Sequence, residues 1–441
     1  MMAPTKEFLE TLLKQKVTSF STEEGTKPGD NVAGSLLSIK VKVASGETLH
    51  LVNKTYSDDP EFKDYAMKFG LFTTENTLYE TVGPRVSALM KAKGVTNPDL
   101  PFPKFYGGNG DMSKGEEFLC LEDVRPAGYS MKDKFVSFNL DETTLVLQEL
   151  AKYHASTYYW IRYEGEKIFD DDEGLKRIRD SPFSGSDPML RVMGTEMFFL
   201  SLRDSISVLE FAGEKDLASR VTSAVLNQGK DKIYEMFNQR NKLTDVATFP
   251  CIIHGDLWVN NILLKYDAKG KPVSLKFVDF QQTRRGNIYE DLIYFIFTST
   301  TPEFRKQYLV QVLNSYYESF AKTLGALGAQ IPIGFSRGKL IDTFYEGILA
   351  GYVYMAFAIP MQLADPVDPK EKAEAMQQQM MNGGGAPPPD PSQMSPEQMM
   401  EMMMKGLEAR SGMFYGQMVK SPKAVTRLVD ITKEIAEMKL F

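Results

Sequence analysis

The sequence predicts an α+β fold of two lobes, a small N-terminal lobe built on an antiparallel sheet and a larger, mainly helical C-terminal lobe. Strand-like segments separated by turn residues dominate residues 20–124, whereas apolar residues at helical spacing dominate residues 125–441. The length of 441 residues points the same way, because one hydrophobic core rarely serves so long a chain. We therefore expect the boundary between the lobes near residue 124.

The small lobe contains four predicted strands and one long helix. The strands are expected at 36–43, 48–54, 104–106 and 117–122. The first two form a hairpin, since Ala44 to Glu47 between them are turn-like. Apolar residues recur at helical spacing between the two pairs of strands: Leu78, Val82, Val86 and Leu89. Gly94 ends this helix, which we expect over residues 75–93.

The large lobe combines long helices with a short strand and a second hairpin. Amphipathic helices are predicted at 145–159, 194–210 and 217–237, the last with a tolerated Gly229, and two or three more within 289–360. An apolar strand at 248–253 precedes a hairpin with strands 262–266 and 274–278.

Residues 365–412 differ in composition from the rest of the large lobe. They hold runs of Met and Gln, three consecutive Gly and three consecutive Pro. Such low-complexity sequence buries little apolar surface, so we expect a disordered insertion. Its methionines could alternatively form an adaptable apolar contact surface. Helical spacing returns from about residue 408.

Composition argues against several classes of function. The net charge of −7 and the pI near 5.4 argue against a nucleic-acid-binding protein. Two cysteines and three histidines lack the spacing of a zinc site. The longest apolar run, residues 347–360, is too short for a membrane span, which needs about 20 residues. The N-terminus lacks the apolar core of a signal peptide, so we expect a cytoplasmic protein, and no protein partner is evident.

Two short segments carry the chemistry. The first runs from His254 to Asn261 and reads His-Gly-Asp-Leu-Trp-Val-Asn-Asn, and the second is Val278-Asp279-Phe280-Gln281. Protein kinases have the order H-R-D-x-x-x-x-N followed by D-F-G, whose first Asp aligns the acceptor hydroxyl while the Asn and the second Asp bind Mg²⁺. Asp256, Asn261 and Asp279 occupy these positions. No P-loop sequence is present.

Each of these residues has a functional and an ordinary structural explanation. We interpret Asp256 as the catalytic base, because its carboxylate would align or accept the proton of an attacking hydroxyl. Asn261 and Asp279 are the candidate magnesium ligands, since Mg²⁺ prefers oxygen ligands and completes its shell with water and phosphate. The structural alternatives are a turn Asp, a loop-capping Asn and a turn that ends a strand.

Three nearby residues are expected to support the site rather than to react. His254 would orient the backbone of its loop, and Trp258 would contribute packing. Asp291, which follows the second hairpin, would accept backbone N–H bonds from the catalytic loop.

Together with these motifs, several further short sequences follow one family pattern: Pro28-Gly29-Asp30-Asn31, Lys54, Phe72-x-x-Glu75-x-x-x-Tyr79, Leu121-Glu122-Asp123, His154-Ala155-Ser156 and Asp291-Leu292. Their order resembles the ecdysteroid kinase-like (CHK kinase-like) family, which is related to the aminoglycoside phosphotransferases and choline kinases. The resemblance runs from about Gly25 to Tyr354. It implies a two-lobed, protein kinase-like fold.

The resemblance also implies a nucleotide site in the small lobe. Lys54 would contact the α- and β-phosphates of ATP, with Glu75 as its ion-pair partner. Other candidates for these two roles are Lys40, Lys42 and Glu80. Gly29 and Asn31 fall in the segment that would cover the nucleotide, and Glu122 lies in the segment that would contact adenine through main-chain groups.

The expected reaction is ATP- and Mg²⁺-dependent phosphorylation of a small-molecule alcohol. The resemblance suggests a steroid-like or otherwise apolar alcohol, with ecdysteroids as the named example. Choline-like and aminoglycoside-like substrates remain open. A protein substrate is not expected, because no A-P-E element follows Asp279. A non-catalytic pseudokinase that binds nucleotide or ligand is the alternative from another class of function.

Overall fold

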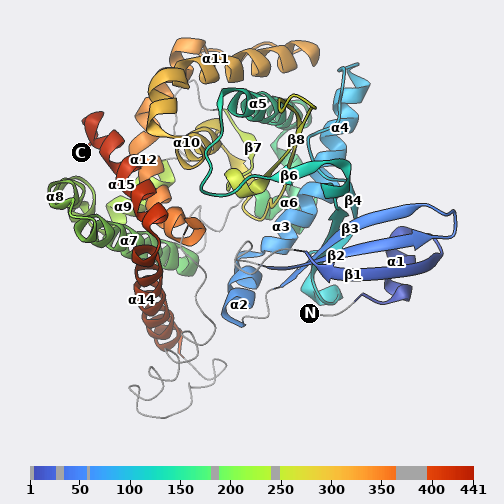
Figure 1. The fold of residues 1–441 in the computed structure, drawn as a ribbon, viewed down its shortest axis with the longest axis horizontal. Helices are drawn as coiled ribbons and strands as arrows, with labels where there is room; N and C mark the ends of the chain where they lie inside the picture. Colours follow the sequence, from blue (N-terminus) through green and yellow to red (C-terminus); the bar gives the residue numbers. More distant parts are fainter. Residues whose placement is uncertain (1–3, 26–33, 57–59, 180–187, 240–248, 364–394) are drawn as a thin grey trace. The chain divides into compact units, whose positions relative to one another are not determined.

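The computed structural model describes residues 4–25, 34–56, 60–179, 188–239, 249–363 and 395–441 (Figure 1). The chain forms two compact units. The first consists of Met1–Pro182 with Arg240–Ile348, and the second of Phe183–Gln239 with Leu349–Phe441. The sheet-rich N-terminal part and the loop that carries Asp256 therefore belong to the same unit.

A five-stranded antiparallel sheet forms the N-terminal part of the first unit. Its strands lie in the order β1-β2-β3-β5-β4. Their bounds are Val17–Glu24 for β1, Gly34–Val43 for β2, Thr48–Tyr56 for β3, Phe105–Asn109 for β4 and Phe118–Glu122 for β5. The predicted β2–β3 hairpin is confirmed, and it places Lys54 opposite Leu36. Strand β1 was not predicted.

The helix α1 (Lys6–Leu13) covers one face of this sheet (Figure 1). Thr5 caps it, because its hydroxyl accepts the Phe8 N–H at 3.1 Å. Leu9 and Leu13 of the helix pack with inward-facing strand residues: Val17, Ile39, Val41, Val43, Leu51 and Cys120. Because side chains alternate between the two faces of a strand, β2 places Ile39, Val41 and Val43 on one apolar face, which a single short helix can bury.

Three helices connect β3 to β4. They are α2 (Pro60–Phe69), α3 (Leu71–Thr77) and α4 (Gly83–Ala92). A π-helical turn, Leu78–Val82, joins α3 to α4. The helix predicted over 75–93 is therefore present, but it contains one turn of π-helix. Glu75 lies in the last turn of α3, one turn before this irregularity.

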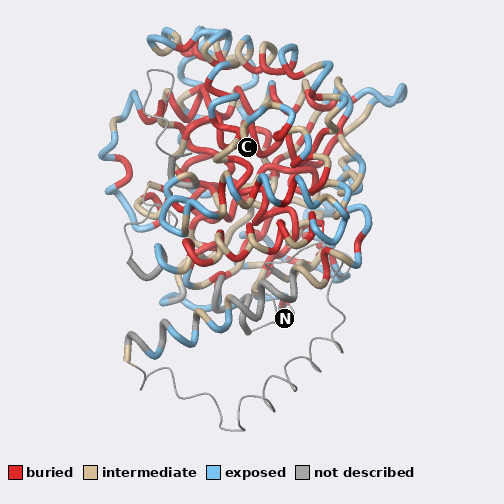
Figure 2. The backbone as a smooth tube through the Cα atoms, turned by 90° about the vertical axis from the view of Figure 1, so that its left-hand side faces the viewer, coloured by how far each residue is buried: buried red, intermediate tan, exposed pale blue. Residues whose placement is uncertain are grey.

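The rest of the first unit surrounds the catalytic loop. Strands β6 (Tyr129–Met131), β8 (Ile262–Tyr266) and β9 (Pro272–Phe277) form one sheet, and β7 (Cys251–Ile253) pairs with β10 (Arg284–Gly286). The helices are α5 (Leu140–Glu164), α6 (Glu173–Arg179), α10 (Ile288–Ser299) and α11 (Pro302–Ala326). The β8–β9 hairpin confirms the prediction. Helix α11 has buried residues at helical spacing, among them Leu309, Leu313 and Tyr316, with exposed positions between them; Figure 2 colours the buried and exposed residues along the chain.

The second unit contains helices α7 (Pro188–Phe211), α8 (Lys215–Ala224), α9 (Lys230–Gln239), α14 (Pro396–Lys420) and α15 (Pro422–Glu437). Helix α12 (Arg337–Leu363) begins in the first unit and continues into the second. The prediction of one helix over 217–237 was wrong. The chain leaves helical geometry near Gly229, whose φ of +86° a right-handed helix does not allow.

The low-complexity segment 365–412 is described only in its last part, because residues 364–394 lie outside the described residues. From Pro396 the chain is helical, in contrast to the expected disorder. Ser395 explains the start of this helix: its hydroxyl accepts the Gln398 N–H at 3.2 Å while the Gln398 side chain accepts the Ser395 N–H at 2.9 Å.

One helix in the described part of the chain, α12, is long and apolar enough to cross a membrane by length and composition. Of its most apolar 18-residue window, 72% is buried inside the protein. A core helix has these same properties, so the helix is weak support for a membrane span.

Candidate active site

The loop between β7 and β8, residues 254–261, is held by Asp291 of α10. One Asp291 oxygen accepts the backbone N–H of His254 at 2.7 Å, and the other accepts that of Gly255 at 2.8 Å. Gly255 has φ +83°, and a Cβ there would lie 2.2 Å from the Gln282 carbonyl oxygen, so the turn requires glycine. The expected role of Asp291 as the acceptor for this loop is confirmed.

Asp291 is itself fixed by two helices behind the loop. His154 of α5 contacts Asp291 Oδ2 through Nε2 at 3.1 Å, and its Nδ1 contacts the Tyr316 hydroxyl of α11 at 2.8 Å. Burial opposes ionisation of Asp291, but the hydrogen bond and charge of His154, with the loop N–H groups, outweigh it and lower the pKa of Asp291. The carboxylate therefore remains an ionised anchor.

His254 links the catalytic loop to the β9 side of the site. Its Nε2 contacts the Val278 carbonyl oxygen at 3.0 Å, and its Nδ1 accepts the Asp256 N–H at 3.3 Å. Burial lowers the pKa of His254, so the ring is neutral near pH 7. A neutral ring bonded on both sides to main chain orients the backbone, as expected from the sequence.

Asp256 projects from this loop and is held by neutral donors. The Tyr294 hydroxyl donates to Oδ1 at 2.8 Å. The Asn261 amide nitrogen donates to Oδ2 at 3.3 Å and to the Asp256 carbonyl oxygen at 2.7 Å. Burial, followed by the charge of Asp279, raises the pKa of Asp256 to about 7. A carboxyl group in this range can exchange a proton near neutral pH.

Tyr294 is a site residue that the sequence analysis missed. It belongs to no motif of the catalytic loop, and it lies on α10, whose residues are all buried. Its spacing does contain a signal. Tyr294 follows Asp291 by three residues on the same helix, so the two side chains share one helix face. Once Asp291 is placed against the loop, Tyr294 must face the loop as well.

Asn261 and Asp279 flank the β8–β9 hairpin, Asn261 directly before β8 and Asp279 two residues after β9. The Val278 N–H donates to the Asn261 carbonyl oxygen at 3.1 Å, which fixes the chain next to Asp279. Asp279 has φ +65°, a left-handed conformation that Asp tolerates better than most residues and that often marks functional sites.

The two residues fit a magnesium ion by their chemistry. The hydrogen bonds of Asn261 to Asp256 use its amide nitrogen, so its side-chain oxygen is the atom suited to a metal. Asp279 adds a carboxylate that already faces a cation, Lys54 Nζ at 2.7 Å. Among the described residues no group of three or more His, Cys, Asp or Glu could hold a metal. A site with two protein ligands suits Mg²⁺, which keeps waters and takes phosphate oxygens.

Lys54 lies between two carboxylates. Its Nζ is 2.8 Å from Glu75 Oε2 and 2.7 Å from Asp279 Oδ1. Burial disfavours the charged amine, but the charges of Asp279 and Glu75 outweigh it and raise the pKa of Lys54. The predicted Lys54–Glu75 ion pair is confirmed. The other candidates, Lys40, Lys42 and Glu80, are exposed.

Glu75 joins the small-lobe helix to the segment after β9. Its Oε1 accepts the Phe280 N–H at 3.1 Å while Oε2 binds Lys54. The Phe280 ring is fully buried, with its centroid 4.3 Å from the ring of His254 and 5.7 Å from that of Tyr79. This packing couples the position of Asp279 to both the helix and the catalytic loop.

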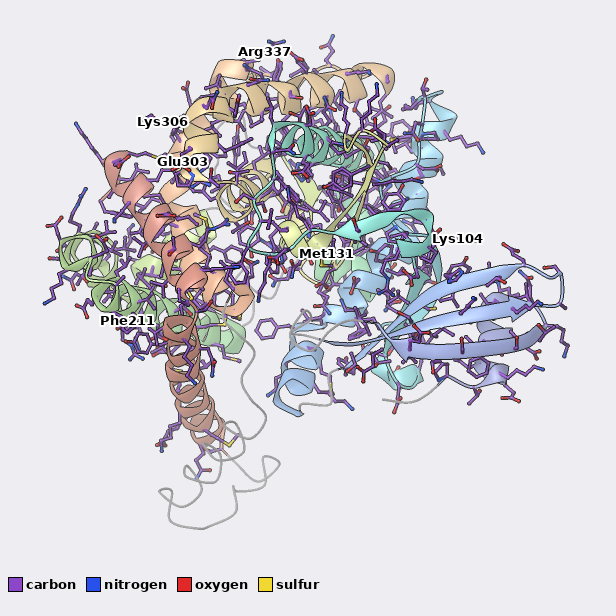
Figure 3. The ribbon with its side chains drawn as sticks, in the orientation of Figure 1. Lys104, Met131, Phe211, Glu303, Lys306 and Arg337 are labelled. Carbon is purple, nitrogen blue, oxygen red and sulfur yellow. The ribbon has the colours of Figure 1, made fainter. Side chains whose placement is uncertain are left out.

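The remaining expected nucleotide residues have different outcomes. Gly29 and Asn31 lie outside the described residues. Glu122 ends β5, where its N–H donates to the Lys104 carbonyl oxygen at 2.8 Å and its carboxylate accepts the Lys104 N–H at 3.3 Å (Lys104 is labelled in Figure 3). The Asp123 N–H is also engaged, by the His50 carbonyl oxygen at 2.9 Å. An adenine contact here would therefore use another main-chain group.

Trp258 is 8% exposed, in agreement with the expected packing role. The site as a whole combines one carboxyl group suited to proton transfer, an amide and a carboxylate suited to Mg²⁺, and a buried lysine suited to phosphate. A two-lobed fold with this set of side chains defines a phosphotransferase of the protein kinase-like class.

The model of the ecdysteroid kinase-like family matches residues 28–329, and the chain belongs to this family. It is accordingly a small-molecule kinase, with an alcohol group as acceptor. Among solved structures, it is similar to the macrolide 2'-phosphotransferase MphH from Brachybacterium faecium in its apoenzyme form. The two chains are 12% identical with a TM-score of 0.35, and the match covers 86% of this chain and 99% of that one. No match was found among curated proteins.

Proposed function

We propose that this kinase transfers the γ-phosphoryl group of ATP to the hydroxyl of a small alcohol, with Mg²⁺ as cofactor, in the cytoplasm. The observation that carries the proposal is the arrangement around Asp256. Asn261 hydrogen-bonds its carboxylate, the charge of Asp279 acts on it, and Lys54 contacts Asp279. A purely ligand-binding protein would have no need for all these groups together.

In the proposed mechanism, Lys54 binds the α- and β-phosphates and Glu75 keeps its amine in place. Asp256 aligns the acceptor hydroxyl and takes its proton as the new oxygen–phosphorus bond forms and ADP leaves. Asn261 and Asp279 would hold Mg²⁺, which supplies neutralisation of phosphate charge when bound. Main-chain groups near Glu122, together with Gly29 and Asn31, are the proposed contacts of the nucleotide.

The substrate class we propose is a steroid-like or otherwise apolar alcohol, in keeping with the family. A choline-like or aminoglycoside-like acceptor carries positive charge and would need acidic or aromatic pocket walls to match it. The two substrate classes therefore differ in charge, and a panel of apolar and cationic alcohols can show which class is phosphorylated.

A test is to incubate the protein with Mg-ATP and a panel of sterols, ecdysteroids, choline and aminoglycosides, and to detect phosphorylated product by mass spectrometry. We expect one apolar alcohol to be phosphorylated, and no product without Mg²⁺. Asp279→Asn should lose Mg²⁺-dependent transfer, whereas Asp267→Asn, in the β8–β9 turn, should retain it. Binding of a lipid or steroid with no transfer to any acceptor would instead support a non-catalytic carrier.

A further inference from the structure

Tyr294 contacts the proposed catalytic base from a direction that the motif residues do not cover. It comes from the middle of α10, is 3% exposed, and donates its hydroxyl proton to Asp256 Oδ1 at 2.8 Å. Asn261 approaches the other carboxylate oxygen, Oδ2, at 3.3 Å. Of these two contacts, the shorter is with Tyr294, a residue outside the catalytic motifs.

Helix α10 gives this hydroxyl a fixed position. At its N-terminus, Asn287 Oδ1 accepts the Tyr289 N–H at 2.9 Å, and Glu290 Oε1 accepts the Asn287 N–H at 3.2 Å. Beyond its C-terminus, buried Arg305 donates to the carbonyl oxygens of Thr300 at 2.7 Å and Ile296 at 3.3 Å. A helix capped at both ends and buried along its length allows little movement of Tyr294.

The same helix also fixes the loop backbone through Asp291, three residues before Tyr294. One rigid element thus holds both the main chain of the catalytic loop and one oxygen of its reactive side chain. The terminal torsion of an aspartate has broad preferences, so a donor on Oδ1 narrows the orientations that the Asp256 carboxylate can adopt. Asn261 is a weaker guide for it, because this amide is also a candidate metal ligand.

We propose that Tyr294 is a positioning residue for the phosphoryl transfer, whose hydroxyl holds the Asp256 carboxylate in the orientation that receives the acceptor hydroxyl. The inference rests on the proposed function and adds to it a residue that none of the motifs identifies. Tyr294 acts through Asp256 and is not assigned a contact with the acceptor or with ATP.

The test compares Tyr294→Phe with Tyr129→Phe. Both changes remove only a hydroxyl, and Tyr129 makes a similar bond, to Ser274 at 2.9 Å, in the β6–β8–β9 sheet. We expect Tyr294→Phe to lower kcat about 10- to 100-fold, the range for one hydrogen bond to a charged group. The KM values for ATP and for the acceptor should change little, and Tyr129→Phe should match the wild type in kcat.

A double-mutant cycle with Asp256→Asn separates positioning from general structure. If Tyr294 acts through Asp256, adding Tyr294→Phe to Asp256→Asn should cost much less than it does in the wild type. An equal loss in both backgrounds, or wild-type kcat in Tyr294→Phe, overturns the inference while leaving the proposed function intact. A wild-type protein that transfers phosphate to no acceptor overturns both. Thermal unfolding of each variant checks that the fold is retained, and dividing kcat by the folded fraction keeps the comparison valid if the Phe variant is less stable.

Discussion

Asp256 and Asp291 belong to the same loop environment, but their carboxylates have opposite surroundings. Asp291 is 1% exposed and accepts two backbone N–H bonds and a contact from His154. Asp256 is half-buried and is held by the Tyr294 hydroxyl and the Asn261 amide, with the negative charge of Asp279 close by. The pKa of Asp291 is lowered, whereas that of Asp256 is raised to about 7.

The difference teaches how two aspartates, one in the loop and one on the helix that holds it, can have separate tasks. Donors aligned on a carboxylate stabilise its charge and make it an anchor, while burial and a neighbouring negative charge make a carboxyl group able to hold a proton near neutral pH. The raised pKa of Asp256 is consistent with its proposed role as the base, and the lowered pKa of Asp291 with a structural role.

The largest effect is expected from Asp256→Asn. The amide keeps the size of the side chain but cannot accept the proton of the acceptor hydroxyl, so transfer should fall by roughly 10²- to 10⁴-fold. Mg-ATP affinity should change little, as measured by calorimetric titration. An Asp256→Asn enzyme with transfer near the wild-type rate would contradict the assignment of Asp256 as the base.

Asp291→Asn should act mainly on stability. It leaves one of the loop N–H groups facing an amide N–H₂ group and removes the charge that His154 contacts, which should cost about 2–4 kcal/mol of unfolding free energy. Urea denaturation measures this loss, with Asp267→Asn as the control for an exposed turn aspartate. If Asp291→Asn were as stable as the wild type, Asp291 would not be the anchor of the loop.

The two aspartates should also give opposite pH dependences of stability in metal-free buffer. Folding lowers the pKa of Asp291, so its contribution is present above the unfolded pKa of about 3.9 and is lost as the pH falls. Folding raises the pKa of Asp256 to about 7, so its ionisation opposes folding increasingly as the pH rises from about 4 to 7.

Asp256→Asn should therefore raise the unfolding midpoint relative to the wild type at pH 8 and have less effect at pH 4.5. Asp291→Asn should lower the midpoint at both pH values, and this deficit should shrink only below the unfolded pKa of about 3.9. Thermal unfolding followed by circular dichroism at both pH values checks the signs. If both variants shifted the unfolding midpoint in the same direction at pH 4.5 and at pH 8, the environments of the two aspartates would not differ as described.

A smaller effect is expected at Glu117, a third buried carboxyl group that extends the comparison away from the active site. It is 4% exposed, and burial raises its pKa to about 7 despite the opposing charge of Arg177. Glu117→Gln should stabilise the protein at pH 8 by roughly 1–2 kcal/mol and have no such effect at pH 4. Transfer activity should be unchanged, and destabilisation at pH 8 would contradict the raised pKa.

The sequence predicted those parts of the site that are local in the chain. The spacing of Asp256 and Asn261 and the hairpin before Asp279 follow from neighbouring residues, and the choice of Lys54 over Lys40 depended on a short pattern. Tyr294 was missed because its relation to Asp256 exists only after α10 folds against the loop. The break near Gly229 was missed because helical spacing of apolar residues continues on both sides of it.

The central claim is that Asn261, Asp279 and Asp256 meet around the terminal phosphate of one nucleotide. A crystal structure with Mg²⁺ and a non-hydrolysable ATP analogue tests it most directly. We predict a metal about 2.1 Å from the Asn261 side-chain oxygen and from one Asp279 carboxylate oxygen, with Lys54 on the phosphates and the γ-phosphate facing Asp256. A nucleotide bound elsewhere, or a metal held by other residues, would contradict the account.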